Sequence, residues 1–439
     1  MDPDPPATPA LAAGPNVRIG PLSMQGWPRT FASLANPQFR TLWISMLFSF
    51  TAIQMSFVAQ GLLTYRITGT ATALAFVGLG WGIAQLPLSF VSGVAADRLH
   101  KRWLIIVSQS TMAVSSLITG LLIVTGTIAL WHIFAMSLVG GCVFAFNIPA
   151  RQAWIPELVP EEHLMNAVAI NSAAFTSTGI LGPALAGLLI AAPFVDLAQV
   201  YFLMSGLFVV VVLLLLRIPG GSAPSPVGRA HPYRELLDGF GYIRRHPVLP
   251  TLLVMGFVPI VIGMSYRTFF PVFQERVYGV GDSWLGAMGA VSAIGALVGA
   301  LWVASLSNTS QRALIQLAGG LGFGVALVLF GAAPTLLPGL VALLFVGLTS
   351  NGYWALNNTM VLGATDREYY GRVMSIYMLS WSFAPFAALP ESAIADAFGV
   401  RQMEVGVGVL LVALMVAIAV LLPGHRRMRQ DESRAAAAG

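Results

Sequence analysis

Charged residues are scarce in this chain. Only 9% of its 439 residues are Asp, Glu, Lys or Arg, whereas soluble proteins carry about 25%. Hydrophobic residues make up 56% of the sequence, and the mean hydropathy is +0.78. This composition gives more apolar surface than a soluble core can bury. It excludes an ordinary soluble domain and indicates a protein that crosses a membrane many times.

Cysteine and lysine are each present once. With Cys142 alone, the chain can form no intramolecular disulfide and no metal site built from several cysteines. With Lys101 as the single lysine, no Gly-x-x-x-x-Gly-Lys-Ser/Thr loop occurs, which excludes an ATP-driven engine of that type. The hydrolase motifs His-Glu-x-x-His and Gly-x-Ser-x-Gly are also absent. We therefore predict no enzyme activity, no metal and no cofactor.

Long apolar runs fill the rest of the chain. A spanning helix needs about 20 apolar residues, and twelve segments qualify. They predict an all-α integral membrane protein, and the segments lie at 38–64, 72–96, 102–126, 129–151, 163–192, 196–217, 248–276, 283–307, 312–333, 335–360, 370–398 and 402–423.

The basic residues predict the orientation of these spans. If both termini are cytoplasmic, 19 of the 23 Lys and Arg residues, Arg151 among them, fall on the inner face. Such asymmetry follows the positive-inside rule and supports the count of twelve. It also explains the net charge of +5 without any affinity for nucleic acid.

The longest polar break divides the spans into two sets of six. We predict a disordered cytoplasmic N-tail (1–35), a first bundle (36–217), a cytoplasmic linker (218–247), a second bundle (248–423) and a cytoplasmic C-tail (424–439). Within the linker, apolar residues recur at steps of three and four, which predicts an amphipathic helix at the membrane surface. The alternative is a plain solvated linker.

A compact group of charges lies between the second and third spans. It reads Gly93-Val-Ala-Ala-Asp-Arg-Leu-His-Lys-Arg102 and must form a short loop, because ions are costly in hydrocarbon. The Gly-x-x-x-Asp-Arg-x-x-basic-basic spacing resembles the signature loop of major facilitator superfamily transporters. The resemblance covers about 400 residues and implies two pseudo-symmetric six-helix bundles.

Other strings are similar to the branch that holds enterobactin-type siderophore exporters and macrolide-type efflux proteins. These strings are NPQFRTLW (36–43), NIPARQA (147–153), PELVP (156–160), NAVAINS (166–172), GPALAG (182–187) and GRVMS (371–375). The resemblance implies a gate at the loop, in which Gly93 packs against the eleventh span and Asp97 lies at its N-terminus. Arg98, Lys101 and Arg102 would hold carboxylates or lipid phosphates. The alternative is that these charges only set the topology.

Two further features lie inside the spans. Gly179, Gly182, Pro183 and Gly187 resemble, imperfectly, the kinked motif of proton-exchanging exporters, although an ordinary packing helix has the same composition. Arg267 and Glu391 fall at similar depths in the second half and are predicted to pair, with Glu391 as proton carrier or Arg267 as an anion site. The alternative is that each side chain reaches the outer surface.

The resemblance also implies which residues line the central cavity. Spans one, four, seven and ten form it in this fold, and an aromatic, amide-rich wall suits a bulky, partly apolar substrate. Besides Arg267, the predicted wall consists of Gln54, Phe57, Phe144, Asn147, Tyr266, Asn351, Tyr353, Trp354 and Asn357.

Together these features predict a secondary transporter in a bacterial inner membrane. We expect a monomeric, proton-coupled antiporter that exports small amphiphilic molecules by alternating access between its two halves, driven by the proton gradient. Its partners would be the small-molecule substrate, protons and lipid. A narrow-specificity siderophore or metabolite carrier or an importer is the alternative within transport, and a membrane sensor or scaffold is the alternative outside it.

Overall fold

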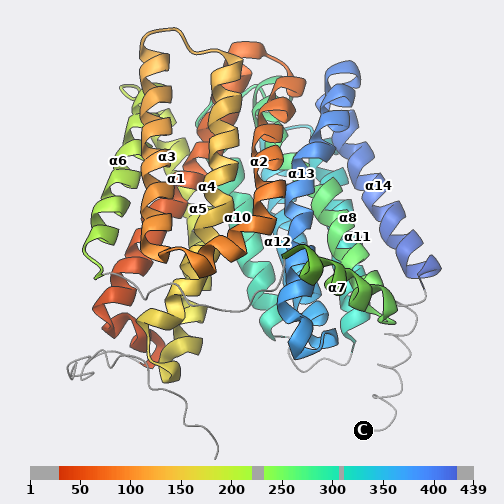
Figure 1. The fold of residues 1–439 in the computed structure, drawn as a ribbon. Helices are drawn as coiled ribbons and strands as arrows, with labels where there is room; N and C mark the ends of the chain where they lie inside the picture. Colours follow the sequence, from red (N-terminus) through yellow and green to blue (C-terminus); the bar gives the residue numbers. More distant parts are fainter. Residues whose placement is uncertain (1–28, 220–231, 306–310, 423–439) are drawn as a thin grey trace, which may run out of the picture.

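The structure, a computed structural model, describes residues 29–219, 232–305 and 311–422 and is drawn in Figure 1. In this part of the chain, twelve helical segments are long and apolar enough to cross a membrane. The expectation of twelve spans is therefore confirmed.

The first half contains six long helices. Asn36 begins the first by accepting hydrogen bonds from the backbone N–H groups of Gln38 and Phe39, at 2.9 and 3.3 Å. Gly69 ends it with a φ of +67°, a left-handed conformation that glycine adopts without strain. The helices are α1 (Pro37–Thr68), α2 (Ala71–Arg98), α3 (Lys101–Val124), α4 (Leu130–Leu158), α5 (Glu161–Ala191) and α6 (Leu197–Leu216).

The second half has the same number of spans, but its first span is broken. That span covers Leu249–Val277 and consists of α8 (Leu249–Gly263), the 3-10 turn η2 (Met264–Phe269), α9 (Phe270–Val272) and the π turn η3 (Phe273–Val277). Five helices follow it: α10 (Trp284–Ser305), α11 (Arg312–Ala332), α12 (Leu336–Ala364), α13 (Tyr370–Phe398) and α14 (Val400–Leu421).

The two ends of the bundle carry different connections. At one end, here called the linker end, lies α7 (Pro232–Arg245), which precedes the second half. The other end, here called the distal end, carries the tight turns at Gly69, Gly126 and Gly399, all with positive φ. Figure 1 shows α7 across the bottom of the bundle and the turn between α3 and α4 at the top.

Contacts between the halves follow two seams, α2 with α13 and α5 with α10. In the first seam, a methyl group at Gly82 would lie 3.1 Å from both the Phe386 ring and the Ser382 carbonyl oxygen. In the second, a methyl group at Gly187 would lie 2.7 Å from the Cα of Gly286. Gly187 and Gly286 lie near the distal ends of their helices, so the halves touch closely there.

The linker helix α7 is docked on the second half. Tyr242 donates a hydrogen bond to the carboxylate of Asp366 at 3.0 Å, and its ring stacks on Tyr369 at 4.1 Å. Ile243 is buried against residues of α8, α11 and α13. In contrast, Leu237 and Phe240 remain about half exposed. The segment is therefore a helix, and some of its apolar residues pack against the second half while others remain exposed on the surface of the protein.

Two sequence-based boundaries need correction. Residues Arg29–Ala35, assigned to a disordered tail, form the 3-10 turn η1, in which the Ser33 backbone N–H bonds to Asn166 at 3.0 Å. The fourth span does not end at residue 151 but continues to Leu158, because neither Pro149 nor Pro156 interrupts α4. Arg151 is consequently inside a helix and 3% exposed, so it does not belong to an inner loop.

Candidate functional site

A carboxylate of the second half caps a helix of the first half at the distal end. Asp396, near the end of α13, accepts hydrogen bonds from the backbone N–H groups of Ala71 and Thr72 at 2.9 and 2.8 Å. It also accepts one from the Thr72 hydroxyl at 2.7 Å. An anion at the N-terminus of a helix is stabilised by the unpaired N–H groups and by the helix dipole. The contact therefore holds α2 and α13 together.

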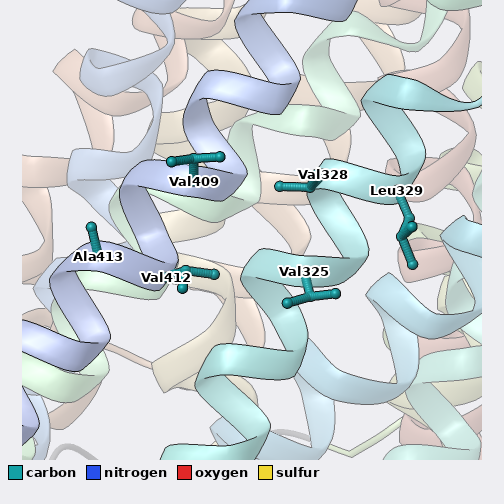
Figure 2. Close-up of a pocket in the computed structure, with 6 residues that line it drawn as sticks. All are labelled: Val325, Val328, Leu329, Val409, Val412 and Ala413. Carbon is teal, nitrogen blue, oxygen red and sulfur yellow. The ribbon is translucent and has the colours of Figure 1, made fainter.

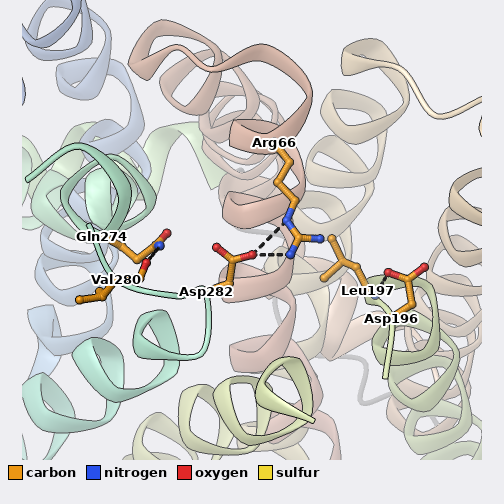
Figure 3. A network of polar contacts seen from close by, with 6 residues as sticks. All are labelled: Arg66, Asp196, Leu197, Gln274, Val280 and Asp282. Atoms are coloured by element: carbon orange, nitrogen blue, oxygen red, sulfur yellow. Dashed lines mark hydrogen bonds and ion pairs between the residues drawn. The ribbon is translucent and has the colours of Figure 1, made fainter. Parts of the chain in front are cut away.

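Two arginines add to this distal contact. Arg66 of α1 forms an ion pair and hydrogen bonds with Asp282, just before α10 (Figure 3). Arg276 of η3 donates to the Gly69 carbonyl oxygen at 2.6 Å and lies over the Tyr65 ring. Arg66 with Asp282, Arg276 with Gly69, and Asp396 with α2 are here called the distal lock. Each of these contacts joins the two halves.

The predicted kink motif in α5 lies against both halves. α5 is one continuous helix through Pro183. A methyl group at Gly182 would lie 3.0 Å from the Thr51 carbonyl oxygen of α1, and one at Gly179 would lie 3.6 Å from the Gln54 amide nitrogen. Gly187 faces α10 in the other half. These small residues permit close packing at the seam.

Aromatic rings of four helices in the first half form a connected cluster. The ring centroids of Phe175 and Phe50 are 5.0 Å apart, those of Phe50 and Phe144 6.5 Å. Trp81 lies 5.1 Å from both Phe144 and Phe57. Phe57 is 46% exposed and Phe175 is 48% exposed. The cluster thus presents accessible rings at its two ends.

The face of α1 that carries Phe57 points toward the second half. Gly61 lies one turn further along the same face, and a methyl group there would be 3.4 Å from Pro271 of the other half. Trp81, which the sequence reasoning missed, precedes Gly82 at the α2–α13 seam and donates a hydrogen bond to Gln85 at 2.8 Å. This aromatic cluster is therefore the best candidate for a substrate-contacting surface in the first half.

Four of the predicted wall residues are buried inside their own half-bundles. Their exposed fractions do not exceed 4%, and the four are Asn147, Tyr266, Tyr353 and Asn357. The Tyr353 hydroxyl donates to the Met255 carbonyl oxygen at 2.6 Å, for example. Asn357 likewise donates to the Tyr377 hydroxyl at 3.0 Å and accepts from Gln316. In this structure these residues are buried and hold helices together, and their place in the cavity wall stays a prediction.

The remaining wall candidates are half-buried or exposed. Gln54, Phe144, Asn351 and Trp354 are half-buried, and Phe57 is exposed. Asn351 donates to the Ala296 carbonyl oxygen of α10 at 2.9 Å. Asn358, which the sequence reasoning missed, lies one helical turn beyond Trp354 and has an amide oxygen without a hydrogen-bond partner. The half-buried face of α12 therefore carries Asn351, Trp354 and Asn358.

Arg151 forms a second polar centre that the sequence reasoning missed. Its guanidinium donates to the Asn147 amide oxygen at 2.9 Å and to the Ser45 hydroxyl at 3.1 Å, while Nη2 has no partner. In the part of the chain that the structure describes, no acidic side chain forms an ion pair with it. An arginine buried this way is costly, which marks it as a functional candidate.

Arg267 and Glu391 do not form the predicted ion pair. Arg267 is exposed, and its guanidinium donates to the Tyr266 hydroxyl at 3.0 Å. Glu391 is 8% exposed and has one carboxyl oxygen without a hydrogen-bond partner. They diverge because residue 267 lies in the 3-10 turn η2, where a side chain's direction differs from that in a continuous α-helix.

The predicted gate motif is described only in part. Gly93, Asp97 and Arg98 lie in α2, but their side chains are outside the described residues. Lys101 forms an ion pair with Glu157 of α4 at 2.8 Å. Arg102 donates to the carbonyl oxygens of Leu215 and Leu216, at 3.2 and 2.7 Å, and so caps α6. Both basic residues therefore tie α3 to neighbours within the first half.

A shallow groove of about 360 Å³ lies on the outer surface between α11 and α14 (Figure 2). Only apolar side chains line it, and Figure 2 shows them on the two helices. They are Val325, Val328, Leu329, Val409, Val412 and Ala413. An apolar lining on the outside of a membrane-spanning bundle suits lipid chains, so we do not assign the substrate to this groove.

Two six-helix halves that meet at α2–α13 and α5–α10, with a distal lock and a docked linker helix, define a membrane transporter of the major facilitator superfamily. Residues 28–437 match the model of the transmembrane secretion effector family, and the chain belongs to that family. Its members are transporters that bind small molecules and are not enzymes.

Relatives and solved structures agree with this assignment. The chain is 25% identical over 431 residues to the enterobactin exporter EntS of Escherichia coli O6:K15:H31 (strain 536 / UPEC), covering 95% of this chain and 100% of the relative. A bacterial homolog of the human lysosomal transporter Spinster, solved in an inward-facing, unoccupied conformation, matches with a TM-score of 0.73 at 14% identity, covering 90% and 98% of the two chains. The nucleoside transporter NupG matches with a TM-score of 0.65 at 13% identity, covering 87% and 99%.

Proposed function

We propose that this chain is a proton-coupled antiporter that exports small amphiphilic molecules across a bacterial inner membrane. Both termini and the linker end face the cytoplasm, as the distribution of basic residues indicates. The distal lock then closes the outer side of the molecule. The observation that carries the proposal is this lock, because a transporter that alternates access needs breakable contacts between its halves at one end.

The aromatic cluster supports the choice of substrate. Phe57 and Phe175 offer accessible ring faces, and Trp81 adds a large apolar surface beside the seam. Such a surface suits a partly aromatic molecule that stacks on rings and places its polar groups on nearby amides. Gln54, on α1 between Phe50 and Phe57, provides such an amide.

A narrow-specificity siderophore carrier is the second candidate. It is supported by the 25% identity to the enterobactin exporter EntS over 95% of this chain. The two candidates differ in how many unrelated compounds the protein moves, so a panel of substrates separates them.

The test is uptake into inverted vesicles under an imposed proton gradient, with catecholate siderophores and amphiphilic drugs as candidates. We expect gradient-dependent accumulation of at least one compound, and a marked loss with Phe57→Ala and Trp81→Ala. The matched control is Phe398→Ala, which removes a ring that is 72% exposed at the distal end of α13. If no compound accumulates in response to the gradient, the antiport proposal is refuted.

A further inference from the structure

Two carboxyl side chains are buried together in the second half. Glu391 of α13 is 8% exposed and Glu404 of α14 is 1% exposed. They lie close enough to interact electrostatically. Each has one oxygen, Oε2 of Glu391 and Oε1 of Glu404, that has no hydrogen-bond partner. In the described part of the chain, neither forms an ion pair with a basic side chain.

Two adjacent carboxylates without a counter-ion cannot both remain charged at this depth without a large cost. One or two bound protons remove that cost. The hydroxyl of Ser265, in the broken part of the seventh span, contacts Glu391 and donates its hydrogen to the Ile262 carbonyl oxygen at 3.0 Å. Ser265 therefore offers Glu391 a polar contact from the seventh span.

The other charged and titratable groups near the pair lie toward the distal surface. Tyr278 lies close enough to Glu404 to interact with it electrostatically, and its hydroxyl has no hydrogen-bond partner. Arg401 lies near Tyr278, but its guanidinium donates to the carbonyl oxygens of Gly331 and Ala332 at the end of α11. On the other side, Arg267 of η2 bonds to Tyr266, and α8 contains no titratable residue.

The pair is joined directly to the distal lock. Asp396, which caps α2, lies on α13 five residues after Glu391. A single residue, Gly399 with a φ of +101°, then connects α13 to α14, and Glu404 follows in the first turns of α14. A change in how these two helix ends pack therefore acts on the contact that closes the distal end.

We propose that Glu391 and Glu404 form a shared proton-binding site that controls the distal lock. The protonated pair fits the closed packing of α13 and α14, while the doubly ionised pair repels itself and favours the open distal end. Tyr278 and Ser265 supply hydroxyl groups beside the pair. This assignment rests on the proposed proton-coupled function and names the residues that carry the proton.

The test measures distal opening directly and needs no substrate. Spin labels are placed on Thr127→Cys and Leu337→Cys, two exposed distal positions in opposite halves, in a Cys142→Ala background. We expect the closed distance at low pH and a growing open population as pH rises. The ratio changes by up to about tenfold per pH unit for each proton released. Glu391→Gln and Glu404→Gln imitate the protonated pair and should keep the distal end closed at every pH.

The matched control is Glu162→Gln, a carboxyl that is 76% exposed at the start of α5 and should leave the pH profile unchanged. A pH profile unaffected by both Gln variants, or opening controlled by sodium at constant pH, overturns the proposal. If the variants do not fold, infrared titration of the unsubstituted protein decides, since the absence of a protonated carboxyl band near neutral pH also overturns it.

The two proposals can fail separately. Proton-driven transport that persists in both Gln variants refutes the proton site and leaves the exporter intact. A pH-dependent distal distance that needs both carboxyls, in a protein that moves no tested compound, supports the proton site and refutes the export proposal.

Discussion

Asp396 and Thr72 join the two halves of the molecule across 324 residues of sequence. Thr70, the N-cap residue of α2, accepts a hydrogen bond from the Ala73 N–H at 3.3 Å, and the carboxylate of the other half caps the N–H groups of Ala71 and Thr72. α2 is therefore fully capped only while the distal end is closed. The capping of the α2 N-terminus thus depends on the position of the other half.

Asp396→Ala should weaken the closed state. Losing a helix cap costs about 1 kcal/mol, which shifts the ratio of closed to open molecules about fivefold toward opening. The distance between labels at Thr127 and Leu337 measures this shift. Asp196→Ala is the matched control, because Asp196 caps α6 within a single half. An equal shift in both variants would show that general helix stability, rather than the contact between the halves, is responsible.

Arg151→Met should separate stability from function. The buried guanidinium has one nitrogen without a partner, so an apolar side chain of similar length should leave the melting temperature in detergent unchanged or raise it. Transport should nevertheless fall by about tenfold or more if the charge serves the transport cycle. Arg151→Lys keeps the charge but not the paired contacts to Ser45 and Asn147, and should retain partial activity. Full transport by the Met variant would contradict a functional role.

The sequence predicted the spans well because hydrophobic length alone determines them. It failed for the directions of individual side chains. Tyr353 and Trp354 are neighbours in an apolar helix, yet one is 4% exposed and the other half-buried, since each residue turns the helix by about 100°. No alternation of polar and apolar residues marks the cavity side of α12, so its wall could not be assigned residue by residue.

Long-range contacts were also beyond the sequence. Glu404 is three residues from Arg401, near the start of α14, and nothing in this local sequence indicates that packing of α14 against α11 and α13 buries it. The predicted fourth span ended at residue 151, but α4 continues to Leu158 and Arg151 is buried in it. In both cases tertiary packing, rather than local composition, determines the environment of the charge.

His246 should make the docking of α7 depend on pH. Its Nδ1 accepts hydrogen bonds from the backbone N–H groups of Val248 and Leu249, at 3.3 and 3.2 Å. An accepting Nδ1 carries no proton, so the imidazole ring is neutral when these bonds are made. Burial lowers the pKa of His246 below its ordinary value of 6.5. Its contribution to stability is thus complete above pH 6.5 and is lost as pH falls through the lowered pKa.

Hydrogen exchange of α7 and the start of α8 measures this effect. We expect protection to decrease on acidification in the unsubstituted protein, and His246→Asn to have lower protection with little pH dependence. His132→Asn is the control, because that histidine accepts a bond only at the distal start of α4. A pH profile that His246→Asn leaves intact would assign the effect to other groups.

Gly187→Ala should open the distal end by steric force. The added methyl group would lie 2.7 Å from the Cα of Gly286 and 2.8 Å from the Ser283 carbonyl oxygen. Both are backbone atoms and cannot rotate away, so α5 and α10 must separate. Overpacking of this kind costs about 1–3 kcal/mol, which favours the open population about five- to 150-fold. Gly206→Ala is the matched control, since nothing lies within 4 Å of its added methyl group. The two variants should express alike and differ in the distance between the labels on Thr127 and Leu337. A Gly187→Ala protein that stays closed would contradict the prediction, because it would show that the α5–α10 seam tolerates a wider spacing.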